Sequence, residues 1–80
     1  MLDVNEFAMR MREARTMMNM TLQKLAASIN YSQTHVEHVA GAQYPPSLEM
    51  AMAIAEALHV DLEWLCGLQD MPRRADSIEW

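Results

Sequence analysis

The 80 residues carry a formal net charge of −5, are 51% hydrophobic and include two glycines, three prolines and one cysteine. A chain of this length forms one small domain, with a single core and no deep enclosed active site. One cysteine excludes an internal disulfide, and no apolar run resembles a signal peptide or is long enough to cross a bilayer. The composition therefore predicts a cytoplasmic domain of helices joined by short turns.

The negative charge is concentrated in the second half of the sequence. Residues 1–20 and 21–46 each balance their acidic and basic side chains, whereas residues 47–66 contain only acidic ones, namely Glu49, Glu56, Asp61 and Glu63. Net negative charge argues against a nucleic-acid partner, because affinity for nucleic acids comes largely from neutralising phosphates. Since the first half is neutral, the net charge alone does not decide the question.

Helical signals begin at Asp3. Asp3 and Glu6 have the spacing of a capping box, while Leu2 and Phe7 occupy the positions of a hydrophobic staple. The first helix then continues to Asn19, which is a plausible stop. Its apolar side chains recur at helical spacing and predict one buried stripe, formed by Phe7, Met11, Ala14 and Met18.

Two short helices follow, separated by a turn of three residues. Thr21 is the predicted cap of the second helix, and Ser32 is the predicted cap of the third. Asn30 makes the turn between them, because asparagine tolerates a positive φ next best after glycine. The predicted inward residues are Leu22, Leu25, Ala26 and Ile29 in the second helix and Val36, Val39 and Ala40 in the third.

The rest of the chain predicts a loop, two more helices and a tail. Pro45 and Pro46 place a loop before the fourth helix, and Ser47 and Asp61 are the predicted caps of the fourth and fifth helices. Residues 1–67 therefore form the domain, and residues 68–80 form a C-terminal tail available for dimerisation or a partner. The predicted buried residues are Leu48, Ala51, Ile54, Ala55, Leu58, Leu62 and Leu65.

The residues around the three-residue turn have the spacing of a helix-turn-helix. Ala26 is small enough for the two helices to approach closely, Asn30 makes the turn, and Val36 and Val39 anchor the second of these helices onto the first. In a helix-turn-helix, the second helix enters the major groove of DNA.

From about Phe7 to Leu68, the sequence resembles the Cro/C1-type helix-turn-helix family of phage repressors and bacterial regulators. The resemblance lies in "RMREARTMMNMTLQKLAASINYSQTHVEHV" and "YPPSLEMAMAIAEALHVDLEWLCGL". It implies an all-α fold, a compact five-helix bundle of the lambda-repressor-like type. It also implies a transcriptional regulator that binds double-stranded operator DNA as a homodimer, with repression as the favoured role.

The resemblance assigns base reading to the third helix. Gln33 and Thr34 would reach base edges, joined by Glu37 and His38 one turn later. Glutamine pairs with adenine, threonine contacts the thymine methyl group, and glutamate accepts from cytosine. The residues expected to contact the DNA backbone are Thr21, Gln23, Lys24, His35, Gln43 and Tyr44.

The sequence departs from the family pattern in four ways. Leu22 replaces a frequent glutamine, Ala40 replaces a glutamate that pairs with the arginine matching Arg15, Gly41-Ala42 replaces Asn-Gly, and the following loop is uncharged. We therefore expect weak non-specific binding with a shallow salt dependence. A competing hypothesis is a protein-interaction module, such as an antirepressor or antitoxin, that retains the fold with weak or lost DNA binding.

Other reactive side chains do not form a catalytic or metal-binding pattern. His35 and His38 lack a third ligand, so we expect neither metal nor cofactor, and no nucleophile has catalytic spacing with a base, so we expect no enzyme. Met9 and Met17 are candidates for an exposed partner surface. Trp64 is expected at the edge of the bundle or in a dimer interface.

Overall fold

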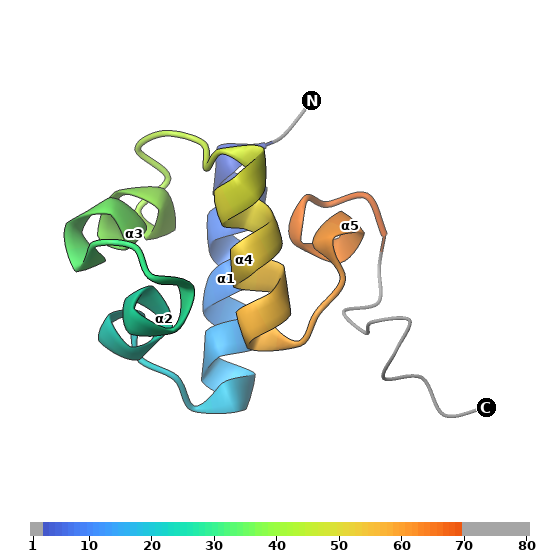
Figure 1. The fold of residues 1–80 in the computed structure, drawn as a ribbon. Helices are drawn as coiled ribbons and strands as arrows, with labels where there is room; N and C mark the ends of the chain where they lie inside the picture. The colour runs from blue at the N-terminus through green and yellow to red at the C-terminus, as the bar shows by residue number, and fades with distance from the viewer. Residues whose placement is uncertain (1–2, 70–80) are drawn as a thin grey trace.

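The computed structural model describes residues 3–69, which form five helices and no strand (Figure 1). α1 and α4 lie side by side at the centre, with α2 and α3 on one side of them and α5 on the other. The predicted all-α, five-helix fold is confirmed. The predicted staple residue Leu2 and residues 70–80 of the predicted tail lie outside the described residues. The helices are α1 (Val4–Met18), α2 (Leu22–Ile29), α3 (Gln33–Ala40), α4 (Leu48–Leu58) and α5 (Leu62–Leu65).

The first four helices begin at their predicted caps. A side-chain oxygen at each cap accepts a hydrogen bond from a backbone N–H two or three residues later, at 2.9 to 3.1 Å. These bonds satisfy N–H groups that the first turn of a helix leaves unpaired, which is why short polar side chains begin helices. The four caps are Asp3, Thr21, Ser32 and Ser47.

Two predicted capping interactions differ from expectation. The carboxylate of Glu6 accepts a hydrogen bond from Arg10 Nε at 2.7 Å, where a capping box would direct it to the backbone N–H of Asp3. Asp61 occupies the cap position of α5 but makes no side-chain capping bond. Its Oδ2 instead accepts a hydrogen bond from Gln69 Nε2 at 2.7 Å. The Glu6 bond therefore lies within α1, while the Asp61 bond joins the start of α5 to the residues that follow it.

All five helices contribute to one hydrophobic core. Most of the predicted inward residues are buried, and Leu22, Ile29, Ala40 and Leu62 pack half-buried at its edge. The largest fully buried side chains are Phe7, Met11, Leu25, Met50, Ile54, Leu58, Leu65, Val36 and Val39.

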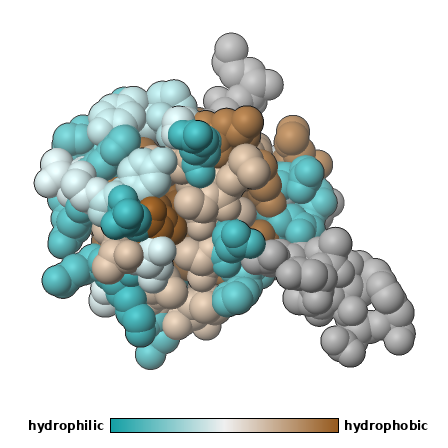
Figure 2. Space-filling view, in the orientation of Figure 1, coloured by the Kyte–Doolittle hydropathy of each residue, from teal (hydrophilic) through white to brown (hydrophobic). Residues whose placement is uncertain are grey.

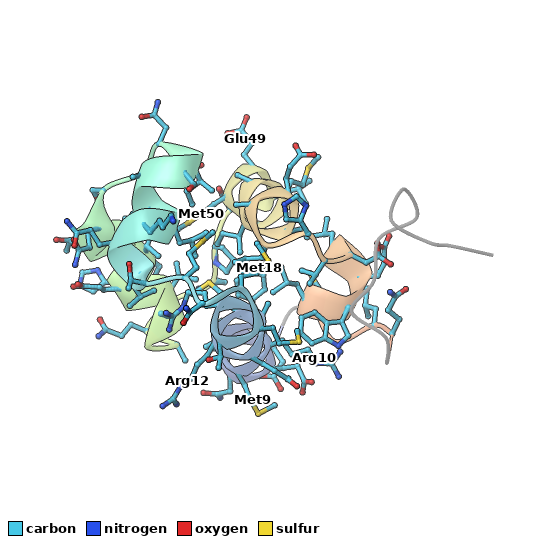
Figure 3. All side chains as sticks on the ribbon, turned by 90° about the horizontal axis from the view of Figure 1, so that it is seen from below. Met9, Arg10, Arg12, Met18, Glu49 and Met50 are labelled. Atoms are coloured by element: carbon cyan, nitrogen blue, oxygen red, sulfur yellow. The ribbon has the colours of Figure 1, made fainter. Side chains whose placement is uncertain are left out.

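Two of the predicted core positions are wrong. Leu48 is 68% exposed, whereas Met50, two residues later on α4, is fully buried (Figure 3). Two residues of helix correspond to about 200° of rotation, so these side chains point in nearly opposite directions. Met18 is 39% exposed, because the last turn of α1 extends past the end of α4 (Figure 1).

Arg10 holds α5 against α1, a role that the sequence analysis did not predict. Its Nη1 donates hydrogen bonds to the carbonyl oxygens of Trp64 at 2.9 Å and Gln69 at 2.7 Å. Its guanidinium also lies over the indole ring, 5.2 Å from the ring centroid. Trp64 is consequently buried, and Figure 3 shows Arg10 extending from α1 toward α5. The indole is therefore part of the core of the single chain.

No helix within residues 3–69 is long and apolar enough to span a membrane.

Candidate nucleic-acid interface

The turn between α2 and α3 fixes how α3 is presented. Asn30 ends α2 in the left-handed conformation, with φ 65°, and the N–H of Tyr31 donates to the carbonyl oxygen of Ala26 at 3.0 Å. Ala26 of α2 and Val36 and Val39 of α3 are buried in the same hydrophobic core. The helix-turn-helix packing predicted from the sequence is therefore present.

The beginning of α3 projects polar side chains into solvent. Gln33, Thr34 and Glu37 are all exposed, whereas Val36 and Val39 on the same helix are buried. Gln33 Nε2 donates a hydrogen bond to Glu37 Oε2 at 2.9 Å. Two of the residues predicted to read bases are therefore joined in one hydrogen-bonded pair.

The two histidines of α3 pack against Tyr44 in the loop before α4. His38 Nδ1 lies 3.0 Å from the hydroxyl oxygen of Tyr44, and the two ring centroids are 5.5 Å apart. The His35 ring lies between Tyr31 and Tyr44, with centroid distances of 5.5 and 5.8 Å. Both imidazoles are half-buried, so this cluster fixes the loop against the outer side of α3. His35, His38 and Tyr44 were predicted from the sequence as separate DNA contacts, and their packing in one cluster was not predicted.

The beginning of α2 supplies a second polar segment. Thr21, Gln23 and Lys24 are exposed, and the Thr21 hydroxyl accepts a hydrogen bond from the Lys24 N–H at 3.1 Å. Leu22 is half-buried against the core. The departure from the family pattern at this position therefore adds apolar packing and leaves the neighbouring polar side chains in solvent.

A sequence profile described as helix-turn-helix matches residues 11–65, more than half of the chain. The chain belongs to the Cro/C1-type helix-turn-helix family. No curated protein and no solved structure matches the chain significantly. The family consists of DNA-binding regulators and is not typically enzymatic, and the matched region contains the whole of α2 and α3.

The end of α3 shows how the chain accommodates the replacement of the family's Asn-Gly. Gly41 has an ordinary φ of −87°, and Ala42 takes the left-handed conformation with φ 60°. A residue with a Cβ in this region costs about 1 to 2 kcal/mol relative to its preferred backbone. The loop nevertheless closes, because the N–H of Gln43 donates to the carbonyl oxygen of His38 at 3.0 Å.

Position 40 is alanine in this chain, where the family usually has a glutamate that pairs with the arginine matching Arg15. Arg15 Nη1 donates to the carbonyl oxygen of Met20 at 3.1 Å, but its Nε is buried with no hydrogen-bond partner among residues 3–69. Burial, and to a smaller extent the charge of Arg12, lowers the pKa of Arg15. A buried donor without an acceptor costs roughly 1 to 3 kcal/mol. Arg15 Nε is therefore an unsatisfied buried donor within the described part of this chain.

The surface formed by α2 and α3 is polar and carries little formal charge. Figure 2 shows mostly hydrophilic residues over these two helices and more apolar ones over α4. Lys24 and Glu37 are the only Lys, Arg, Asp or Glu residues between positions 21 and 46. Fixed charge at this surface therefore favours neither attraction to phosphates nor repulsion from them, because one lysine is balanced by one glutamate.

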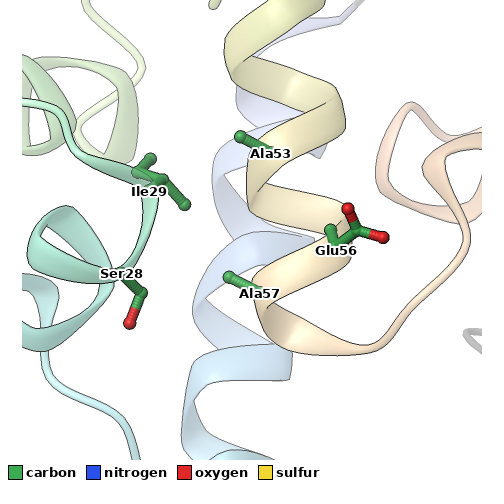
Figure 4. A pocket seen from close by; sticks show the side chains of 5 residues that line it. All are labelled: Ser28, Ile29, Ala53, Glu56 and Ala57. Carbon is green, nitrogen blue, oxygen red and sulfur yellow. The ribbon is translucent and has the colours of Figure 1, made fainter.

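A shallow groove separates α2 from α4 (Figure 4). Its volume is about 340 Å³, and it contains a single ionisable side chain, Glu56. No group of three or more histidine, cysteine or carboxylate side chains within residues 3–69 is placed to hold a metal ion. The groove is lined by Ser28, Ile29, Ala53, Glu56 and Ala57.

Proposed function

We propose that the protein is a sequence-specific, double-stranded DNA-binding transcriptional regulator, a homodimeric repressor that reads a short palindrome with α3. One observation carries the proposal. Within a family of DNA-binding regulators, this chain presents the exposed polar side chains of Gln33, Thr34 and Glu37 at the start of a helix whose other side is anchored in the core. That arrangement suits insertion of the N-terminal part of α3 into the major groove.

The proposed contacts divide into two groups. Gln33, Thr34, Glu37 and His38 contact base edges, which carry sequence information in the major groove. Contacts to the phosphate backbone position the domain and carry no base sequence. The proposed backbone contacts are Thr21, Gln23, Lys24, His35, Gln43 and Tyr44.

Dimerisation is part of the proposal because one eight-residue helix contacts only a few base pairs. Two copies related by a two-fold axis would place their α3 helices in successive major grooves, about 34 to 36 Å apart. We place the dimer contact on the side of α4 and α5. Leu48 and Met52 of α4 and Leu68 after α5 support this choice, since they are 68%, 53% and 74% exposed.

A protein-interaction module is the second candidate function. The observation that favours it is the charge of residues 21–46, where Lys24 is the only lysine or arginine. Such a surface gains little from counterion release, which supplies essentially all of non-specific DNA affinity. In this case the exposed apolar side chains, or the tail over residues 68–80, would bind a protein partner, as in an antirepressor or antitoxin.

Selection from a random double-stranded DNA library tests the proposal. The purified protein is expected to enrich a palindrome, and the double variant Gln33→Ala, Thr34→Ala is expected to lose that enrichment while keeping its helical circular dichroism spectrum. If the folded wild-type protein enriches no sequence at low salt, DNA reading is refuted and the interaction module is favoured.

A further inference from the structure

Two exposed side chains on α3 form a hydrogen bond whose direction is chemically fixed. Gln33 Nε2 lies 2.9 Å from Glu37 Oε2, one helical turn away. An ionised carboxylate only accepts hydrogen bonds, so the amide of Gln33 must turn its NH₂ group toward Glu37. The carbonyl oxygen of the amide therefore points away from the carboxylate.

We infer that Glu37, in addition to the base contact proposed for it, is a positioning residue that orients the amide of Gln33 so that Gln33 reads adenine and rejects guanine. The inference rests on the proposed function and adds the identity of one base to it. Glu37 engages one amide hydrogen, which leaves Gln33 one N–H donor and one carbonyl acceptor. Adenine presents the N7 acceptor and the N6 amino donor in the major groove, so it matches both remaining groups.

Guanine does not match the oriented amide. Its major-groove edge presents two acceptors, N7 and O6, and therefore requires two donors. Gln33 has only one N–H left when the other is bonded to Glu37, so its carbonyl oxygen would face O6 without a hydrogen between them. An amide released from Glu37 can rotate and offer both hydrogens to guanine. The hydrogen bond to Glu37 thus makes Gln33, which could otherwise bind either purine, selective for adenine over guanine.

The effect of the Glu37 charge must be separated from the effect of the hydrogen bond. Removing a negative charge from a DNA-binding surface strengthens binding to every duplex, whatever its sequence. Glu37→Ala and Glu37→Gln remove the same charge. Glu37→Gln keeps an amide oxygen that can accept from Gln33 Nε2, but its own NH₂ group can also donate to the Gln33 carbonyl, so it fixes the orientation of Gln33 only in part. Alanine and glutamine are both good helix formers, so neither variant should disturb α3.

The experiment compares base selectivity at one defined position. Gln33→Ala first identifies the base pair in the enriched palindrome whose preference depends on Gln33. Dissociation constants are then measured for two duplexes that differ only there, with adenine or guanine on the contacted strand. We expect the wild type to favour adenine by about tenfold or more, Glu37→Ala to discriminate by no more than about threefold, and Glu37→Gln to lie between the two.

Each alternative outcome refutes a defined statement. Equal selectivity in Glu37→Ala and the wild type would overturn the positioning role, and so would equal loss in both Glu37 variants, because charge alone would then explain it. A wild-type preference for guanine would overturn the base assignment. If the folded wild-type protein enriches no sequence, the proposed function fails and the inference fails with it. Circular dichroism of each variant excludes unfolding as the cause.

Discussion

Replacing Arg10 by methionine should destabilise the domain strongly, because its guanidinium lies between α1 and α5. Its side chain is 18% exposed and makes hydrogen bonds to two backbone carbonyls. Such bonds from a charged donor contribute about 1.5 to 3 kcal/mol each, and the contact with the Trp64 ring adds about 0.5 to 1 kcal/mol. The ion pair with Glu6 is partly exposed and adds about 0.3 to 0.5 kcal/mol.

These contributions are not additive, and methionine preserves much of the aliphatic packing. We therefore expect a loss of about 2 to 4 kcal/mol in the free energy of unfolding. For a domain of this size, that corresponds to a fall in Tm of roughly 10 to 25 °C.

Urea and thermal denaturation, followed by circular dichroism, measure this loss. Arg12→Met is the matched control, because Arg12 lies on the same helix, is exposed and points away from the bundle (Figure 3). The control should change the free energy of unfolding by less than about 0.5 kcal/mol. If Arg10→Met is as stable as Arg12→Met, the hydrogen bonds from Arg10 do not hold α5 in place.

Two further predictions concern places where this chain departs from its family, and a third concerns Lys24, a proposed contact to the DNA backbone. Ala42→Gly should raise the free energy of unfolding by about 1 kcal/mol, because glycine adopts the φ of 60° without strain; chemical denaturation showing a loss would contradict the left-handed assignment. Ala40→Glu should raise the free energy of unfolding by about 1 kcal/mol by giving Arg15 Nε an acceptor, and Ala40→Gln should raise it by less. Equal free energies of unfolding for the two variants would show that the carboxylate does not reach Arg15. Lys24→Ala should reduce the slope of log K against log salt by about 1, as expected for one phosphate contact; an unchanged slope in a fluorescence anisotropy titration would remove Lys24 from the interface.

The start of each of the first four helices could be predicted because its cause is local. A capping hydroxyl or carboxylate bonds to an N–H only two or three residues later, so Thr21, Ser32 and Ser47 were identifiable from the sequence alone. Asn30 was identifiable for a similar reason, since a short turn between helices needs a residue that tolerates positive φ.

Which side of a helix faces the core was harder to predict. Leu48 and Met50 are both apolar, and the choice between them depends on how α4 rotates against α1 and α2. The contacts of Arg10 join residues 54 and 59 positions apart, so no local pattern indicates them.

The residues of the candidate interface were predicted from the sequence, but most of the contacts among their side chains were not. Gln33 and Glu37 have i,i+4 spacing, so their hydrogen bond could have been expected from the sequence. The contacts of His35 and His38 with Tyr44 could not, because they depend on a loop that contains an alanine at positive φ. Local spacing indicated which residues are exposed, and the tertiary structure determined which of them meet.

The most direct test of DNA reading is a measurement of the specificity ratio. This ratio is the dissociation constant for a scrambled duplex divided by the dissociation constant for the enriched palindrome, both measured at the same salt concentration. A sequence-reading regulator should give a ratio of about 10³ or more, and the Gln33→Ala, Thr34→Ala variant should bring it close to one. A wild-type ratio near one, with the protein folded, would contradict a regulator that reads sequence through α3.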